Sequence, residues 1–261
     1  MQISLRDKHA LICGSTQGIG LAIAGELAVL GASCTLLARN EAALQHAVSL
    51  LDTSAGQQHG YLVADFSFPE QVERAIAGHV AGNKVHVLVN NTGGPPPGSI
   101  SEAAPYDFVK YFEQHVVCNQ ILVQHCLPSM KADQYGRIIN IISTTVRIPI
   151  ENLGISNTVR GAVASWAKTL SLEVAQFGIT VNNILPGFTK TERLNALIRS
   201  IASRKNMEAD DVARQMATEV PARRFGDAAE IAAVAAFLAT PAAAYVNGTS
   251  IPVDGGRTGA I

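Results

Sequence analysis

The chain has 261 residues, of which 48% are hydrophobic and 16% are charged, and its formal net charge is −1. A net charge so close to zero produces no field that would attract nucleic acid or an anionic membrane, so neither partner is expected. No uninterrupted apolar run reaches the roughly 18 residues that a membrane span needs. The first thirteen residues include Arg6, Asp7, Lys8 and His9, which makes a poor secretory signal. We therefore expect a cytoplasmic protein.

The four cysteines are Cys13, Cys34, Cys118 and Cys126, and no two of them form a C-x-x-C pair. This spacing argues against both a metal centre and a disulfide framework. We expect reduced, buried thiols and no bound metal ion.

Short β-branched runs alternate with helix-length segments along the whole chain, which is typical of βαβ units sharing one parallel sheet. The predicted strands are His9–Cys13, Ser33–Ala38, Gln58–Val63, Val85–Asn90, Arg137–Ile142, Thr180–Leu185 and Ser250–Val253. The predicted helices are Ile19–Leu30, Glu41–Leu51, Pro69–Val80, Tyr106–Met130, Ser156–Phe177 and Ala228–Ala239. Residues 1–261 are therefore predicted to form a single Rossmann-type, doubly wound α/β domain, with about seven parallel strands and helices on both faces.

The segment from residue 190 to residue 220 departs from this alternation because it is long, charged and interrupted. It follows the sixth predicted strand, and ligands bind beyond the carboxyl ends of strands in such sheets. We predict a helical substrate lid here, with a plain surface helical pair as the alternative. The apolar residues at helical spacing are Leu194, Leu197, Ile198, Ile201, Val212 and Met216.

Residues 13–20 read CGSTQGIG and form a glycine-rich turn between the first strand and the first helix. Gly14 allows the tight turn, Gly18 lets the backbone approach a pyrophosphate, and Gly20 lets helix and strand pack closely. The amino end of the helix offers unpaired N–H groups and a positive dipole end to phosphates. We therefore predict a dinucleotide site that includes Gly14, Ser15, Thr16, Gln17, Gly18, Ile19 and Gly20.

Further motifs follow later strands: NNTGG at 90–94, GRIIN at 136–140, NNILPG at 182–187 and PVDGG at 252–256. With the glycine turn, they resemble the short-chain dehydrogenase/reductase family over nearly the whole chain, and most closely its 3-oxoacyl-carrier-protein-reductase-like branch. The resemblance implies an oxidoreductase with a nicotinamide cofactor and a small-molecule substrate. It also implies cofactor contacts at Asp65 and Phe66, which flank the adenine in relatives, and at Asn91, Thr92, Gly93, Pro186, Gly187, Thr189 and Thr191.

The resemblance further implies a homotetramer. The helices predicted at Tyr106–Met130 and Ser156–Phe177 carry more apolar surface than one sheet face can cover, and Val163, Trp166 and Leu170 recur there at helical spacing.

Arg39 follows the second predicted strand and bears on the choice of cofactor. The resemblance implies that an acidic residue at the end of this strand selects NAD, whereas this chain has Ala38 there. Arg39 and Ser15 are expected to contact a 2′-phosphate, because a guanidinium matches a phosphate in charge and geometry. NADP(H) is therefore favoured over NAD(H), with Asn40 beside the same group. The alternative is a solvent-exposed arginine at a strand end.

The resemblance implies that Asn, Ser, Tyr and Lys normally handle the proton in this family. Ser143 stands at the expected serine position, but His115 stands at the Asn position, with Asn119 one helical turn further along. Ser156 occupies the Tyr position and Arg160 occupies the Lys position. No tyrosine lies between Ser143 and Arg160, so a shifted Tyr–Lys spacing is excluded.

These replacements do not suit the usual mechanism. A serine hydroxyl has no pKa near neutrality, so Ser156 cannot act as the acid–base group. Arg160 stays protonated, although it can pair with ribose hydroxyls or stabilise an oxyanion. His115 is the nearby residue that titrates in the right range, unless it is simply a packed helix histidine.

Three functions therefore stay open. The favoured one is an NADP(H)-dependent oxidoreductase acting on a carbonyl, enone or acyl thioester, in which Ser143, Ser156 and Arg160 stabilise charge and His115 or water supplies the proton. The second is a catalytically silent NADP-binding protein that serves as a partner subunit or sensor. The third is a dehydratase or isomerase built on the same fold.

Overall fold

The computed structural model describes residues 1–259 and contains a sheet of seven strands in the order β3-β2-β1-β4-β5-β6-β7. Every neighbouring pair in that order is parallel. The strands are β1 His9–Cys13, β2 Ser33–Ala38, β3 Gly60–Val63, β4 Val87–Asn90, β5 Gly136–Ile141, β6 Ile179–Pro186 and β7 Ser250–Val253. The predicted Rossmann-type fold is confirmed, with strand ends within two residues of prediction.

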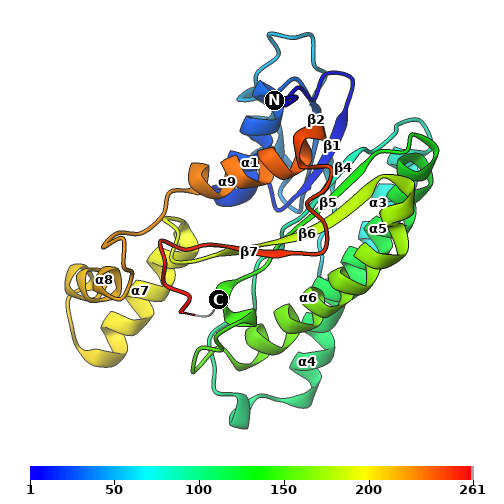
Figure 1. Cartoon of the computed structure of the whole chain (residues 1–261). Coiled ribbons are helices and arrows are strands. Elements are labelled where there is room, and N and C mark those ends of the chain that lie inside the picture. Colours follow the sequence, from blue (N-terminus) through cyan, green and yellow to red (C-terminus); the bar gives the residue numbers. More distant parts are fainter. Residues whose placement is uncertain (260–261) are drawn as a thin grey trace.

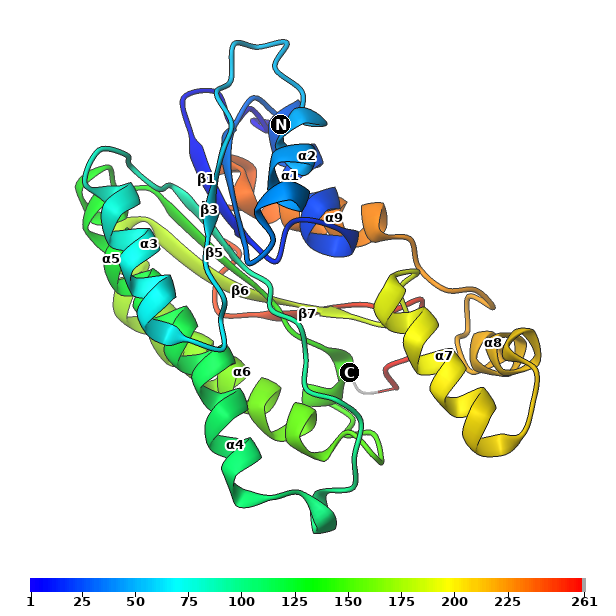
Figure 2. The ribbon, with the colours of Figure 1, turned by 180° about the vertical axis from the view of Figure 1, so that it is seen from behind.

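Helices cover both faces of this sheet (Figures 1 and 2). On one face pack α1 Gly18–Val29, α2 Glu41–Ser49 and α9 Ala228–Ala239, and on the other α3 Pro69–Val80, α5 Cys118–Ala132 and α6 Gly154–Val174. Every residue of β4 and β5 is buried, which explains why apolar residues stand next to each other in these strands instead of alternating with exposed polar ones.

Three helices lie beyond the carboxyl ends of the strands: α4 Pro105–Phe112, α7 Glu192–Lys205 and α8 Ala209–Thr218. In both views, α4 lies on one side of the ends of β5 and β6, and the α7–α8 pair lies on the other (Figures 1 and 2). The pair has an apolar cluster of its own, built around Leu194, Ile198, Val212 and Met216. The segment predicted as a lid is therefore a small helical unit at the edge of the sheet where ligands bind in this fold.

One predicted helix contains a widened turn. Residues 105–132 are helical throughout, which confirms the helix predicted at Tyr106–Met130, but a π-helical turn at Glu113–Val117 lies between α4 and α5. Apolar spacing cannot reveal a single widened turn, since the residues on either side keep their helical period. Such π-turns occur frequently at functional sites, and His115 lies inside this one.

The apolar stripe of α6 does not form a free surface. Val163 and Leu170 are buried against the protein's own sheet, and Trp166 donates a hydrogen bond from Nε1 to Gln120 Oε1 at 2.8 Å. These residues therefore give no support to the predicted tetramer, which stays a prediction based on the family resemblance.

A ladder of polar side chains links four neighbouring strands. Asn90 Nδ2 donates to Asn140 Oδ1 at 2.8 Å, and Asn140 Nδ2 donates to Asn183 Oδ1 at 2.9 Å. Asn183 Nδ2 then donates to Ser250 Oγ at 3.1 Å on β7. Because all three asparagines are buried, this network favours one register of β4 to β7.

The four cysteines are free and buried, as predicted. Within residues 1–259, no helix is both long enough and apolar enough to cross a membrane. The same residues contain no cluster of His, Cys, Asp or Glu suited to holding a metal ion.

Candidate active site

The glycine turn after β1 has no room for side chains at Gly14 and Gly20. Gly14 has φ +58°, and a Cβ there would lie 2.3 Å from the carbonyl oxygen of Asn91. Gly18 also has φ +58°, and a Cβ on Gly20 would lie 2.3 Å from the carbonyl oxygen of Gly14. Gln17, the residue that caps α1, makes no side-chain capping bond within the described chain. The backbone therefore forms a narrow cradle whose helix N–H groups are available to a phosphate.

Two later segments close around this turn. Asn91 Nδ2 donates to the carbonyl oxygens of Cys13 at 3.3 Å and Gly14 at 3.1 Å, which holds the loop after β4 against the turn. Thr191 caps α7 by accepting from Leu194 N–H, and its methyl carbon lies 3.4 Å from where a Cβ on Gly18 would be. The segment after β6 thus reaches the glycine turn.

The remaining predicted cofactor residues occupy the expected edge of the sheet. Phe66 follows β3, and Thr92 and Gly93 follow β4. Pro186 is the last residue of β6, and Gly187 and Thr189 follow it. Thr16 and Ile19 belong to the glycine turn and the start of α1.

Arg39 lies at the adenosine end of the predicted site. Its side chain is 78% exposed, and its Nη1 atom lies 3.9 Å from Asp65 Oδ2, so the pair is long and weak. Asn40 uses its side chain to cap α2, accepting from Ala43 N–H at 3.0 Å. Arg39 is therefore free to turn toward a phosphate, whereas the Asn40 side chain has a structural role.

The structure corrects the prediction for Ser15. Its hydroxyl is fully buried and donates to the carbonyl oxygen of Ile12 at 2.8 Å. The side chain points into the end of β1, so it does not offer a contact to a 2′-phosphate.

Arg160 is the buried charged group of the second part of the candidate site. It is 8% exposed, and its Nη1 atom donates to the carbonyl oxygen of Ile142 at 2.7 Å, just past the end of β5. Its Nε atom donates to Ser156 Oγ at 3.3 Å, one helical turn earlier on α6. Burial lowers the pKa of Arg160 to about 10, which still leaves it protonated at neutral pH.

The two serines share one property. Ser143 directly follows Ile142, and its Oγ accepts from Thr145 N–H at 3.2 Å. Ser156 likewise accepts from Arg160. A hydroxyl that accepts a hydrogen bond still has its own hydrogen to donate, so both serines can donate to a substrate oxygen.

His115 is buried inside the π-turn, and its Nε2 atom has no hydrogen-bond partner in the described residues. Burial, assisted by the charge of Arg160, lowers the pKa of His115 to about 3. The ring is therefore neutral at physiological pH and is not an imidazolium that could give its extra proton to a substrate. Asn119, one turn along, is also buried with an unpartnered Oδ1. The predicted role of His115 as a proton donor does not fit this environment.

A second arginine at this site, Arg193 in the first turn of α7, was missed from the sequence. Its Nη1 and Nη2 atoms donate to the carbonyl oxygens of Gly94 at 2.9 Å and Pro95 at 3.0 Å. A Cβ on Gly94 would lie 2.8 Å from Nη2 of Arg193 and also 2.8 Å from Nη2 of Arg160. No sequence signal could reveal this, because the three residues meet only through the fold.

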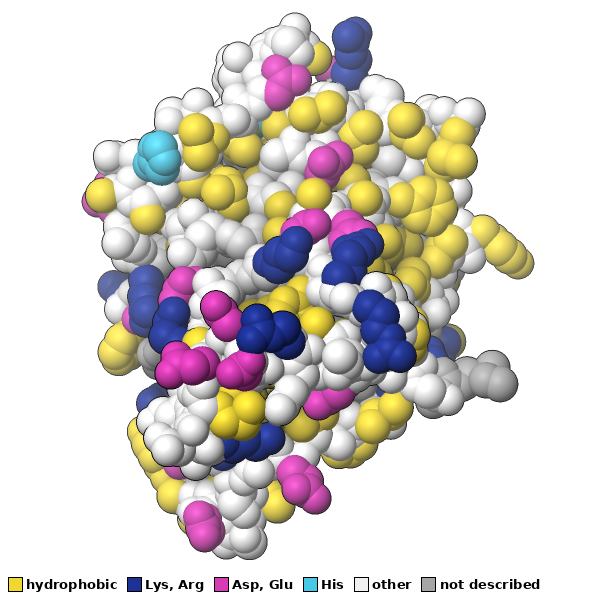
Figure 3. Space-filling view, turned by 90° about the vertical axis from the view of Figure 1, so that its left-hand side faces the viewer, with side chains coloured by type: hydrophobic (Ala, Val, Ile, Leu, Met, Phe, Trp, Pro, Cys, Tyr) yellow, Lys and Arg dark blue, Asp and Glu magenta, His cyan; other side chains and the backbone are white. Residues whose placement is uncertain are grey.

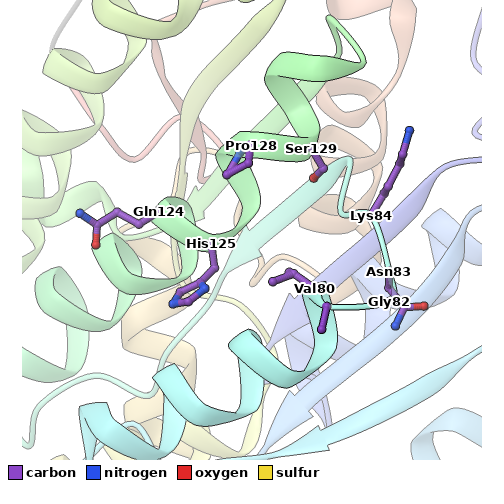
Figure 4. Close-up of a pocket in the computed structure, with 9 residues that line it drawn as sticks. Val80, Gly82, Asn83, Lys84, Gln124, His125, Pro128 and Ser129 are labelled. Atoms are coloured by element: carbon purple, nitrogen blue, oxygen red, sulfur yellow. The ribbon is translucent and has the colours of Figure 1, made fainter.

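A cavity of about 460 Å³ lies elsewhere, between α3 and α5 (Figure 4). Lys84, Asn83, His125 and Ser129 line it, and Lys84 precedes β4. The cavity is therefore at the amino end of the sheet, opposite the glycine turn, and takes no part in the candidate site.

Comparison with known proteins agrees with this geometry. Residues 14–258 match the family model described as Enoyl-(Acyl carrier protein) reductase. The NADPH-dependent reductase BacG of Bacillus subtilis is 28% identical over 97% of this chain and 98% of its own. The 3-oxoacyl-[acyl-carrier-protein] reductase FabG of Vibrio cholerae is 32% identical, with 97% of this chain and 98% of its own covered.

Among solved structures, L-sorbose reductase from Gluconobacter frateurii, complexed with NADPH and L-sorbose, is 30% identical. It superposes with a TM-score of 0.94 over 100% of both chains. The sheet order, the glycine turn and these matches along the chain lead to one conclusion: this protein belongs to the short-chain dehydrogenase/reductase family of oxidoreductases.

Proposed function

We propose that this protein is an NADP(H)-dependent oxidoreductase that acts on a small carbonyl, enone or acyl-thioester substrate without the family's usual Tyr and Lys. The observation that carries the proposal is the buried Arg160–Ser156 pair at the same sheet edge as the glycine turn. The names of BacG and of the sorbose reductase complex, which both mention NADPH, support the choice of cofactor.

The residues present fit such a cofactor. The turn at Gly14, Gly18 and Gly20 leaves room only for backbone, and the amino end of α1 faces it. Arg39 would hold the 2′-phosphate, and Thr191 would lie over the phosphates beside Gly18. When bound, NADPH supplies the hydride for reduction.

Ser143 and Ser156 would donate hydrogen bonds to the substrate oxygen, where negative charge develops. Arg160 strengthens the Ser156 hydroxyl as a donor, because a charged group that donates to an oxygen polarises it. Arg160 also supplies a fixed positive charge close to that oxygen. Preorganised donors of this kind supply the largest share of stabilisation in many enzymes.

Water is the best-supported source of the proton. His115 Nε2 and Asn119 Oδ1 are buried polar atoms on residues four positions apart, and neither has a partner among residues 1–259. Buried polar atoms without a protein partner commonly hold an ordered water molecule. We assign His115 and Asn119 the role of positioning this water.

Loss of NADPH absorbance, measured across ketones, enones and acyl thioesters, tests the proposal. Ser143→Ala and Ser156→Ala should each lower turnover roughly 100-fold, the usual effect of removing one oxyanion donor, with NADPH affinity nearly unchanged. Thr169→Ala is the matched control, since that exposed hydroxyl on α6 donates only to the carbonyl of Ser165. Absence of turnover with every substrate would favour the silent nucleotide-binding protein.

A further inference from the structure

Two guanidinium groups from distant parts of the chain meet at Gly94. Arg160 comes from α6 and Arg193 from α7, and the Nη2 atom of each lies 2.8 Å from the same point, the place of a Cβ on Gly94. The two nitrogens are therefore within twice that distance of each other. Two like charges this close repel, and burial of Arg160 strengthens the repulsion by excluding water.

No carboxylate in residues 1–259 pairs with either group. On the face that carries α7 and α8, by contrast, the Lys and Arg side chains lie among Asp and Glu side chains (Figure 3). The paired arginines there are Arg199 with Glu192, Arg214 with Asp211, Arg224 with Glu230 and Arg257 with Glu219. Arg160 and Arg193 are bonded to uncharged oxygens, which satisfy hydrogen bonds but leave the net charge uncompensated.

Both side chains have donors to spare. A guanidinium carries five N–H bonds in a planar fork. Arg160 uses Nε and Nη1 on Ser156 and Ile142, and its Nη2 has no hydrogen-bond partner in the described chain. Arg193 uses one N–H of each Nη on the loop carbonyls, so its Nε–H and two further hydrogens stay available. Gly94 has no side chain between the two Nη2 atoms, and a Cβ there would lie 2.8 Å from each of them.

We propose that Arg160 and Arg193 bind the carboxylate of the substrate, so that the substrate is a short oxo acid. This proposal rests on the function proposed above. A carboxylate matches a guanidinium fork in shape and relieves the repulsion between the two cations. Arg160 holds Ser156 through Nε and faces Gly94 through Nη2. These two nitrogens share one edge of the planar guanidinium, so the carboxylate and the carbonyl oxygen would bind side by side. That spacing favours a carboxylate next to the carbonyl carbon or one carbon away.

Calorimetric titration of the full chain with NADP⁺ bound tests the proposal without turnover. The probes are oxamate, which carries a carboxylate beside a carbonyl, and oxamide, its neutral counterpart. Oxamate should bind at least about tenfold more tightly than oxamide, the value of one charge-assisted hydrogen bond. Equal binding of the two probes would overturn the proposal.

The variant series separates charge recognition from structure. Arg193→Gln should remove most of the preference for oxamate while leaving NADP⁺ affinity within about twofold, and Arg193→Lys should keep part of the preference. Arg199→Ala, on the same helix and paired with Glu192, should change neither. A purely structural role would weaken both probes equally. If Arg193→Gln weakens NADP⁺ and spares oxamate, the arginine serves the cofactor's phosphates and the proposal is wrong.

The outcome is independent of the proposed reaction. A silent nucleotide-binding protein could still prefer oxamate, which would support the oxo-acid site without the proposed reaction. An active reductase that accepts neutral ketones and binds oxamate no better than oxamide would support the proposed reaction and exclude the oxo-acid site. Tight binding of inorganic phosphate at this site, with no binding of oxamate, would also overturn the assignment to a carboxylate.

Discussion

The glycine turn and the first turns of α6 reach the same edge of the sheet, but different features specify them. In the turn, backbone shape determines which residues fit, because a Cβ at Gly14 or Gly20 would lie 2.3 Å from a carbonyl oxygen. In α6, side-chain chemistry determines what the site can bind, because Ser156 and Arg160 are bonded to each other on a regular helix. The cofactor cradle therefore tolerates almost no substitution, whereas the reaction site can change its residues while the fold stays intact.

Gly14→Ala should give the largest effect. Its φ of +58° and its contact with Asn91 make any side chain strained, so we expect a loss of roughly 3 kcal/mol in unfolding free energy. NADPH binding should fall with it. Urea unfolding and calorimetry measure the two effects. Gly25→Ala in α1, where nothing lies within 4 Å, is the control and should stabilise by about 0.5–1 kcal/mol.

Arg160→Ala tests the proposed reaction site on α6. Its removal leaves Ser156 and the Ile142 carbonyl without their charged partner, so turnover should fall roughly 100-fold. NADPH affinity should also fall, because the family resemblance predicts that this residue contacts the nicotinamide ribose. Steady-state kinetics with one responsive substrate measures both. Unchanged turnover would show that Arg160 is only a packing residue.

His115→Asn tests whether the imidazole is buried in its neutral form. The pKa of His115 is about 3 in the folded protein, against 6.5 as its ordinary value. Between these values the unfolded chain binds a proton that the folded chain does not, so stability is complete above the higher value and declines as the pH falls. The slope should be about 1.4 kcal/mol per pH unit for this residue.

Unfolding free energies at several pH values from about 4.5 to 7.5 measure this slope. The variant should lose the contribution of His115 to the pH dependence of the unfolding free energy. It should keep the contribution of His9, because burial also lowers the pKa of His9. Identical slopes for the two proteins would mean that His115 titrates normally in the folded state.

Arg39→Ala should give the smallest effect, because the side chain is exposed. NADPH affinity should fall about tenfold, the value of one charge-assisted contact, while NADH affinity stays the same. Arg74→Ala is the control, since that guanidinium bonds within α3 to the Glu70 carbonyl. Equal affinity for NADPH and NADH in the native protein would defeat the assignment of Arg39.

The features that the sequence predicts well are those that depend on local backbone shape. Gly14, Gly18 and Gly20 predict the turn because glycine suits its dihedral angles and close contacts. Short β-branched runs predict the buried parallel strands. The π-turn around His115 was missed because one widened turn leaves no mark on the hydrophobic period.

The features that the sequence misses depend on contacts between distant segments. Arg193 and Gly94 lie 99 residues apart and meet only when α7 folds against the loop after β4. Ser15 was misassigned because its position in the motif does not reveal that its hydroxyl turns back to Ile12. The low pKa of His115 likewise arises from burial and from Arg160, neither of which can be deduced from the histidine itself.

The central claim is that the altered site is active in its present form. The most direct measurement is steady-state NADPH oxidation by the native protein beside the double variant Ser156→Tyr with Arg160→Lys, using 2-oxobutanoate and neutral ketones. We predict turnover by the native protein that the double change damages or redirects. No turnover by the native protein, together with new carbonyl reduction by the double variant, would contradict the account and identify a silent nucleotide-binding protein.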